Sequence, residues 1–123
     1  MRVDIKALSD SELQEQGFSN MSVKLHGFGL YTDDELCAVC ITTEKQDSIS
    51  GEVILEKLFV REDKRLYGVA LKLLNYTLRT MRACGYKYAV AVPDDEAAER
   101  FLTKFGFEKA EGRSALSLYR IEL

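Results

Sequence analysis

A basic residue followed closely by a glycine marks the start of a predicted helix, which a short charged turn connects to a predicted apolar strand. This segment reads Arg65-Leu66-Tyr67-Gly68-Val69-Ala70. The first N–H groups of a helix have no partner inside it and carry the positive end of its dipole, so they can receive a phosphate or pyrophosphate. Gly68 would let such a ligand approach the backbone, and Arg65 would supply a cation to the same place. The segment therefore predicts a site for an anionic ligand.

A carboxylate, Glu56, lies inside the apolar strand that precedes this segment. Alternation would place it on one face with Ile54, Leu58 and Val60, where an isolated carboxylate is costly. Partial burial would raise its pKa from about 4.3 towards the range useful for a general base. An ion pair between Glu56 and a neighbouring Lys or Arg is the alternative, and the sequence does not separate the two.

Cys37 and Cys40 have the spacing of a metal or redox motif, and Cys84 is the third cysteine. The first two lie in the predicted strand Leu36–Thr42, in which residues three apart face opposite sides. No second cysteine pair or histidine cluster completes a tetrahedral set, so we expect buried apolar cysteines and no metal site. An odd number of cysteines agrees with a reducing compartment. His26, the sole histidine, is expected to have a structural or surface role.

Two further segments flank the motif that begins at Arg65. They are Leu58-Phe59-Val60, which precedes it, and Ala97-Ala98-Glu99-Arg100-Phe101-Leu102-Thr103-Lys104-Phe105-Gly106-Phe107, which follows it. In this order the three segments resemble the fourth strand, the Arg/Gln-x-x-Gly-x-Gly/Ala signature and the Ala-x-x-Phe-Tyr-x-x-x-Gly-Phe segment of the GNAT superfamily. Members of that superfamily are acetyl-CoA-dependent N-acetyltransferases. The resemblance covers the chain from about Leu30 to Leu123.

The resemblance implies that acetyl-CoA is the co-substrate, and it assigns a role to each motif. The pantetheine arm would enter a gap between two parallel central strands and pair with backbone groups of the earlier strand. The implied contacts are Leu58, Phe59 and Val60 for the arm, and Arg65, Leu66, Tyr67, Gly68, Val69 and Ala70 for the pyrophosphate. Glu56 would be the catalytic base that receives the ammonium proton of the acceptor, directly or through water. Leu58 and Val60 can also belong to the core, because the implied contacts use main-chain atoms.

One position departs from the pattern of the family. Leu102 stands where the family commonly has a tyrosine, whose hydroxyl can protonate the departing thiolate of coenzyme A. A thiolate with a pKa of about 8.5 is a tolerable leaving group without an acid. Thr103 should point off the apolar stripe of its helix, and whether Tyr67 or Tyr76 replaces the missing hydroxyl stays open. Asp95 stands where an asparagine is frequent, and its role is open too.

Length and charge favour a single cytoplasmic domain. A chain of 123 residues is long enough for one core, so residues 1–123 are expected to form one domain. The net charge of −3 gives no reason to expect bulk binding of nucleic acid. No apolar run reaches the length of a membrane helix, and the N-terminus lacks the apolar core of a signal peptide.

Hydrophobic periodicity and turn residues predict the order of the strands and helices. The predicted strands are Val3–Leu8, Phe28–Tyr31, Leu36–Thr43, Glu52–Val60 and Tyr88–Val92, followed by a hairpin of Phe107–Glu111 and Ala115–Leu123. The predicted helices run from a cap at Ser9 or Asp10 to about Gln16, from Leu66 to Cys84, and from a cap at Asp94 or Asp95 to Gly106. We expect an α/β (α+β) fold, in which a mixed, mostly antiparallel sheet of six to seven strands carries helices on both faces. Its two central strands, on either side of the long helix, should be parallel and joined by a right-handed crossover.

The function expected from the resemblance is transfer of an acetyl group from acetyl-CoA directly to a primary amine. An acyl-CoA-binding sensor or interaction module is the alternative, since Leu102 lacks a hydroxyl and the N-terminal region is short for the family. A nucleotide-phosphate binder of another fold is disfavoured because no Walker lysine is present. The acceptor is unspecified: the acidic turn Asp33-Asp34-Glu35 could favour cationic amines or could simply be solvated. A homodimer that completes the acceptor pocket is a further expectation.

Overall fold

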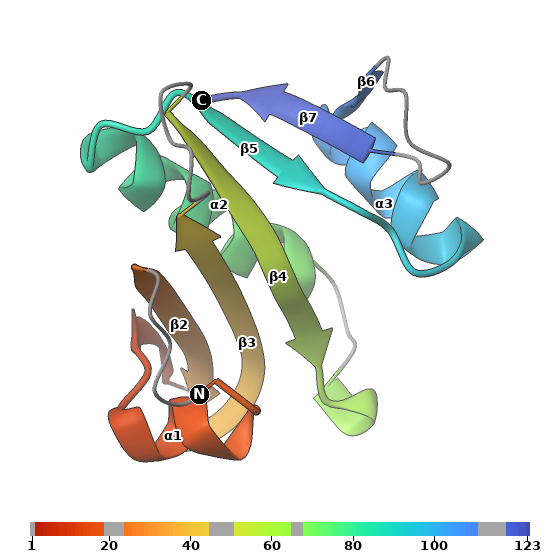
Figure 1. Cartoon of the computed structure of the whole chain (residues 1–123). Helices are drawn as coiled ribbons and strands as arrows, with labels where there is room; N and C mark the ends of the chain where they lie inside the picture. Colours follow the sequence, from red (N-terminus) through yellow and green to blue (C-terminus); the bar gives the residue numbers. More distant parts are fainter. Residues whose placement is uncertain (1, 19–23, 45–50, 65–67, 111–117) are drawn as a thin grey trace.

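The computed structural model describes residues 2–18, 24–44, 51–64, 68–110 and 118–123. Within these residues, seven strands form one sheet with the spatial order β1-β2-β3-β4-β5-β7-β6 (Figure 1). The strands are β1 (Val3–Ala7), β2 (Leu25–Thr32), β3 (Glu35–Glu44), β4 (Glu52–Val60), β5 (Tyr88–Ala91), β6 (Glu108–Ala110) and β7 (Leu118–Glu122). The helices are α1 (Asp10–Glu15), α2 (Val69–Ala83) and α3 (Glu96–Phe105), and a 3₁₀ helix at Glu62–Lys64 follows β4.

The strands pair as the sequence predicts. Among the described strand pairs only β4 and β5 run parallel, and the others are antiparallel. The predicted mixed, mostly antiparallel sheet is confirmed. The predicted start of the long helix at Leu66 lies outside the described residues, and the described helix begins at Val69. The strand predicted to reach Val92 ends at Ala91. No helix in the described ranges is both long and apolar enough to cross a membrane.

Alternate residues of β3 belong to two different cores. Val39 and Ile41 pack with Leu13 of α1. Ala38 and Cys40 instead belong to a larger core, which the apolar faces of α2 and α3 complete. Successive side chains of a strand point to opposite faces, so α1 and α2 cover opposite faces of the sheet, as Figure 1 shows. The prediction of helices on both faces is confirmed.

A β-bulge in β4 changes which side chains share a face. The register between β3 and β4 slips by one residue, which leaves Glu56 as the extra residue of β4. Leu55 and Leu58, on either side of the slip, both pack against the larger core. Glu56 and Lys57 between them therefore face the other side of the sheet, the side that α1 covers. The prediction that Glu56 shares a face with Leu58 and Val60 is wrong, because simple alternation does not continue through a bulge.

A second bulge, in β3, has the same effect on the cysteines. The register between β2 and β3 slips at Cys37, so Cys37 and Cys40 both belong to the larger core. Their predicted placement on opposite faces is wrong, but both are buried free thiols, as expected. Burial raises the pKa of the Cys40 thiol to about 12. In the described part of the chain, no group of three or more His, Cys, Asp and Glu side chains could hold a metal ion.

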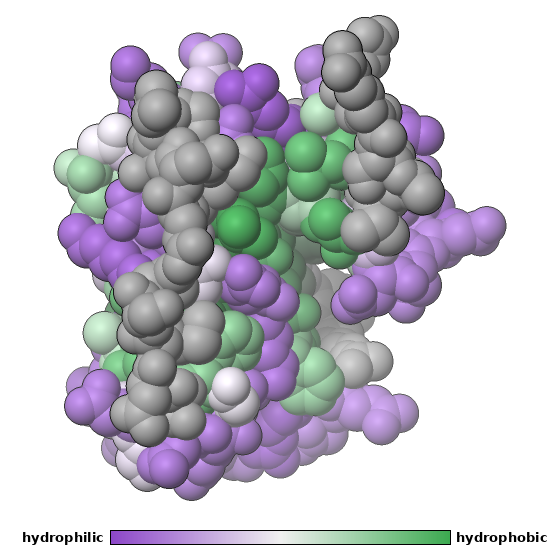
Figure 2. All heavy atoms as spheres, in the orientation of Figure 1, coloured by the Kyte–Doolittle hydropathy of each residue, from purple (hydrophilic) through white to green (hydrophobic). Residues whose placement is uncertain are grey.

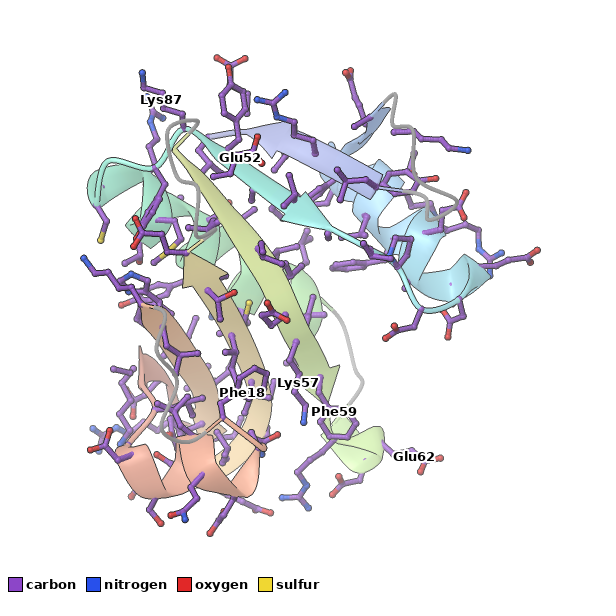
Figure 3. The ribbon with its side chains drawn as sticks, in the orientation of Figure 1. Phe18, Glu52, Lys57, Phe59, Glu62 and Lys87 are labelled. Atoms are coloured by element: carbon purple, nitrogen blue, oxygen red, sulfur yellow. The ribbon has the colours of Figure 1, made fainter. Side chains whose placement is uncertain are left out.

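The side chain of Arg120 contacts residues of β4 and β5 at the start of β4. The guanidinium of Arg120 on β7 lies 3.7 Å from the ring centroid of Tyr88 on β5. Its Nη2 atom is also 3.6 Å from a carboxylate oxygen of Glu52, the first residue of β4 (Figure 3). Cation–π and charge contacts of a partly buried guanidinium favour one arrangement of the strands that supply them. The first residues of β4 and β5 are therefore held beside each other and beside β7.

Helix α1 is attached to the sheet through Glu12. The Glu12 carboxylate accepts a hydrogen bond from the Ser9 backbone N–H (2.9 Å) and another from the hydroxyl of Tyr31 on β2 (2.7 Å). Ser9 Oγ in turn accepts from the Glu12 backbone N–H, which completes a capping box and makes Ser9 the N-cap. The bond from the Ser9 backbone is the main cause of a lowered pKa at Glu12. Burial, and then the bond to Glu12, raise the pKa of Tyr31.

Replacing this carboxylate should weaken the fold only when it would be charged. Glu12→Gln is expected to lower the free energy of unfolding at pH 7 by about 0.5 to 1 kcal/mol, because a neutral amide replaces the charged acceptor of two hydrogen bonds. Folding lowers the pKa of Glu12, so its contribution is present above the unfolded value of about 4.3 and is lost as the pH falls through the folded value. Urea unfolding of both proteins at pH 7 and at about pH 3 measures the difference.

Glu15→Gln, at the exposed end of the same helix, is the matched control and should change stability little at either pH. An equal loss for Glu12→Gln at both pH values would show that the charge has no part in attaching α1.

Candidate functional site

A cleft of about 560 Å³ opens beside the second half of β4. It is lined by Leu55–Val60, Gly68–Leu71, Ala91–Asp94, Ala98, Phe101 and Leu102. These residues come from β4, the first turn of α2, the end of β5 with the residues after it, and α3. Most of them are apolar, and Figure 2 shows apolar residues gathered at the centre of this face with polar residues around them. The volume lies within the range of small-molecule sites.

The cleft exists because β4 and β5 part from each other. They pair over three residues, ending at Ile54 with Val90, whereas β4 continues along β3 as far as Val60. Two features oppose longer pairing: Pro93, which has no N–H to donate, lies two residues beyond the end of β5, and the bulge at Glu56 bends β4. Because alternate residues of a strand direct their N–H and C=O groups to the same side, the segment beyond Ile54 presents backbone groups towards the opening. A ligand can therefore pair with β4 as an added strand would.

The first turn of α2 forms the end of the cleft. Gly68, the N-cap, has φ of +74° and carries no side chain that could cap the turn. The Gly68 carbonyl accepts the first helical hydrogen bond, from the Lys72 N–H (2.8 Å). The N–H groups of the residues between them belong to the first turn, which has no intrahelical acceptors. Gly68, Val69 and Ala70 thus lie in one cleft with Leu58–Val60, as the motifs imply.

Three residues of the predicted phosphate motif, Arg65, Leu66 and Tyr67, lie outside the described residues, so their roles stay predictions. The three predicted strand contacts differ among themselves. Val60 is buried and Leu58 packs against the larger core, as expected. Phe59 is 44% exposed and points to the opposite face.

The predicted base, Glu56, lies at the cleft on the face of β4 that points away from α2. One of its carboxylate oxygens accepts a hydrogen bond from Thr43 Oγ1 at 2.7 Å. The expected partial burial is not found, because Glu56 is an exposed residue. The alternative of an ion pair with a Lys or Arg is not found either among the residues that the structure describes. The carboxylate is therefore open to the cleft and held by one neutral donor.

Helix α3 contributes an apolar wall without a hydroxyl group. Leu102, at the position where the resemblance implies a tyrosine, is 4% exposed and lies between the core and the cleft. The Thr103 hydroxyl donates to the Glu99 carbonyl of its own helix (2.9 Å), as expected for a side chain off the apolar stripe. Tyr76, one suggested replacement, packs edge-on against Phe28 of β2. Asp95 caps α3, because its carboxylate accepts a hydrogen bond from the Ala98 N–H at 2.8 Å. This cap is the role of Asp95 that the sequence left open.

The sequence does not single out two residues beside Glu56, of which one lines the cleft. Lys57 lies beside Glu56 at the cleft, and its ammonium is 5.8 Å from the ring centroid of Phe59. Figure 3 shows the side chains of Lys57 and Phe59 near the end of β4. Thr43, the partner of Glu56, comes from the neighbouring strand. Alternation predicts Lys57 on the face away from Glu56, so only knowledge of the bulge brings the two charges together.

Sequence comparison identifies the family to which this fold and cleft belong. A model of the acetyltransferase (GNAT) family matches residues 5–107, which is most of the 123-residue chain. The chain therefore belongs to the acetyltransferase (GNAT) family, and the predicted family membership is confirmed. No match is found among the curated proteins.

Solved structures of similar fold include several acetyltransferases. The ribosomal-protein-S18-alanine N-acetyltransferase of Escherichia coli has a TM-score of 0.80 and 17% sequence identity, over 98% of this chain and 94% of that one. PaiA N-acetyltransferase from Thermoplasma acidophilum, in complex with coenzyme A, has a TM-score of 0.78 and 11% identity over 100% of both chains. A candidate streptothricin acetyltransferase from Bacillus anthracis, in complex with acetyl coenzyme A, has a TM-score of 0.78 and 11% identity over 100% and 99%. At these identities the likeness shows the shared fold.

The backbone at the start of α2 should resist substitution. Gly68→Ala is expected to cost about 1 kcal/mol of unfolding free energy, because a residue with a Cβ is strained at positive φ. The added Cβ would meet no atom closer than Leu71 Cβ at 4.0 Å, so backbone strain rather than a clash causes the loss. Gly68→Asn should cost less, since asparagine tolerates this conformation better than alanine. Urea unfolding of the three proteins tests this order; an equal or larger loss for asparagine would contradict it.

Proposed function

We propose that the protein is an acetyl-CoA-dependent N-acetyltransferase that acetylates a primary amine. The observation that carries the proposal is the parting of β4 from β5 after Ile54, which opens a strand edge beside the first turn of α2. Membership of the acetyltransferase (GNAT) family supports it. So do the relatives of the same fold that were solved with coenzyme A or acetyl coenzyme A.

The described residues fit a pantetheine arm joined to a pyrophosphate. The backbone of Leu58, Phe59 and Val60 would pair with the amide groups of the arm, as an added strand pairs with a sheet edge. The first-turn N–H groups at Gly68, Val69 and Ala70 would bind the pyrophosphate oxygens, and the helix dipole would favour their charge. By the motif, Arg65 would add a cation, and Leu66 and Tyr67 would also contact the pyrophosphate. The apolar side chains of the cleft would exclude water from the thioester.

In the proposed transfer, the lone pair of the acceptor amine attacks the carbonyl carbon of the thioester. A nitrogen–carbon bond forms, the carbon–sulfur bond breaks, and the proton lost by the nitrogen passes to Glu56 or to a water that Glu56 holds. Thr43 would be a positioning residue, since its hydroxyl fixes one carboxylate oxygen at 2.7 Å. A backbone N–H of the segment Leu58–Val60 would polarise the carbonyl. Most of the acceleration would come from orienting amine and thioester in one cleft.

The sulfur would leave as a thiolate and take its proton from water. Leu102 offers no hydroxyl, and the Thr103 hydroxyl is engaged with its own helix. A thiolate with a pKa of about 8.5 leaves without a protein acid, at some cost in rate. Tyr67, the other suggested source of a proton, lies outside the described residues.

The buried Leu102 also favours a second candidate function on the same scaffold. With no acid beside the sulfur, the protein could bind acyl-CoA as a sensor or interaction module with little or no transfer. A panel of primary amines, assayed with a thiol reagent that detects released coenzyme A, separates the two. Acetylation of any amine above the hydrolysis background excludes the sensor. Tight acetyl-CoA binding with no acetylation of any amine would exclude the transferase. Cytoplasmic location, single-domain organisation and a homodimer stay predictions.

Removing the carboxylate should impair transfer and not coenzyme binding. Glu56→Gln is expected to lower kcat/KM for the amine about 100-fold, the usual contribution of a general base, because the amide cannot accept the ammonium proton. The affinity for acetyl-CoA, measured by calorimetry, should be unchanged because Glu56 points away from α2. Glu108→Gln, on the exposed β6 strand, is the matched control and should retain full activity. Unchanged kcat/KM in Glu56→Gln would show that another group takes the proton.

A further inference from the structure

Two opposite charges lie beside each other at the cleft because of the bulge in β4. Leu55 and Leu58 both pack against the larger core, so Glu56 and Lys57 both face the side of the sheet that α1 covers. Both residues line the cleft. Without the bulge, consecutive residues of a strand would point to opposite faces. The cleft therefore has an anion and a cation next to each other on one wall.

Each of the two charges is held by a neutral partner. The Glu56 carboxylate accepts from the Thr43 hydroxyl, and the Lys57 ammonium lies 5.8 Å from the Phe59 ring centroid. Neither forms an ion pair within the described ranges of the chain. Arg61, one residue beyond β4, differs because its guanidinium pairs with the carboxylates of Glu35 and Asp63. A third charged residue of the cleft, Asp94, comes from the segment after β5, so on the β4 wall the charges of Glu56 and Lys57 are those left for a ligand to neutralise.

Two residues of the acidic turn between β2 and β3 are engaged away from the cleft. Glu35 is engaged with Arg61, and a carboxylate oxygen of Asp33 accepts from the Arg2 backbone N–H at 2.9 Å. Neither residue is among those that line the cleft. The alternative that this turn selects cationic amines therefore has no support in the contacts of Glu35 and Asp33.

We propose that the acceptor is a small primary amine that also carries an anionic group, a carboxylate or a phosphate. The proposal rests on the transferase function proposed above. Glu56 would receive the amine, and Lys57 would bind the anionic group in a charge-assisted hydrogen bond. The Phe59 ring, 44% exposed, would cover the carbon chain between the two ends. A diamine would place its second ammonium against Lys57 and would be disfavoured, because like charges repel across a short distance.

Matched pairs of acceptors test this. The pairs are β-alanine with β-alaninamide, 4-aminobutyrate with 4-aminobutanamide, and phosphoethanolamine with ethanolamine, and 1,4-diaminobutane is added as a cationic acceptor. Each amine is assayed by release of coenzyme A with the wild type, with Lys57→Met and with the control Lys104→Met, whose substituted lysine is exposed on α3. Comparing a variant with the wild type on the same amine removes the effect of differences in amine basicity.

Lys57→Met should lower kcat/KM about tenfold for the anionic member of the preferred pair, and change the neutral member by no more than about twofold. It should raise kcat/KM for the diamine, a change of sign that a merely structural role of Lys57 would not produce. Lys57→Arg should restore most of the preference. The carboxylate pairs and the phosphate pair show separately which anion is bound. Lys104→Met should behave as the wild type.

Three results would overturn the proposal. One is an equal loss on the anionic and neutral members, which would make Lys57 structural. A wild type that prefers the neutral members or the diamine would contradict it directly. Weaker acetyl-CoA binding by Lys57→Met in calorimetry would assign the lysine to the coenzyme. If acetyl-CoA binds but no amine in this panel or in the wider panel is acetylated, the proposed transferase function is wrong. If amines are acetylated without the expected preference, only the proposed acceptor class is wrong.

Discussion

The early end of the β4–β5 pairing is the constraint on which the site depends. The two strands share three paired residues, and then β5 ends before Pro93 while β4 bends at Glu56 and continues with β3. Backbone groups that would otherwise pair with β5 are directed towards a cleft. The same parting leaves the first turn of α2, which follows β4 in the chain, at the end of that cleft. The parted strand edge and the helix N-terminus lie in one cavity. A long ligand can therefore pair with the strand while its anionic group binds at the helix.

The parting of β4 and β5 destabilises the centre of the sheet, because the two strands form fewer backbone hydrogen bonds with each other. Other contacts must offset this loss. Arg120 supplies one such contact, because its guanidinium joins Glu52 and Tyr88 at the paired ends of β4 and β5. The larger core supplies more: α2 and α3 pack in one cluster that spans both strands, with Val53 of β4 and Ala89 of β5 fully buried in it. The packing on either side of the opening thus offsets the lost pairing, and buried core residues such as Ala91 and Leu102 form part of the cleft wall.

Element order, the parallel pair and the N-caps of α1 and α3 could be predicted from periodicity, capping residues and the positions of Gly and Pro, because these depend on local chemistry. The sheet face towards which each strand residue points could not be predicted. Alternation fails at Glu56 and at Cys37, because a bulge adds one residue to one strand and no residue type in the sequence marks its position. As a result, the sequence suggests a buried Glu56 and gives no reason to notice Lys57. The predicted coenzyme motif can be recognised in the sequence because it lies in continuous segments, whereas the proposed acceptor wall combines β3, β4 and the bulge between them.

Hydrogen–deuterium exchange of the protein with and without saturating acetyl-CoA tests the central claim most directly. If the parted edge of β4 and the first turn of α2 hold the coenzyme, exchange should slow in peptides that cover Leu55–Val60 and Gly68–Leu71. Peptides from α1 and from the β6–β7 hairpin should keep their rates. Protection confined to other segments, or no protection at a coenzyme concentration that calorimetry shows to be saturating, would contradict the claim.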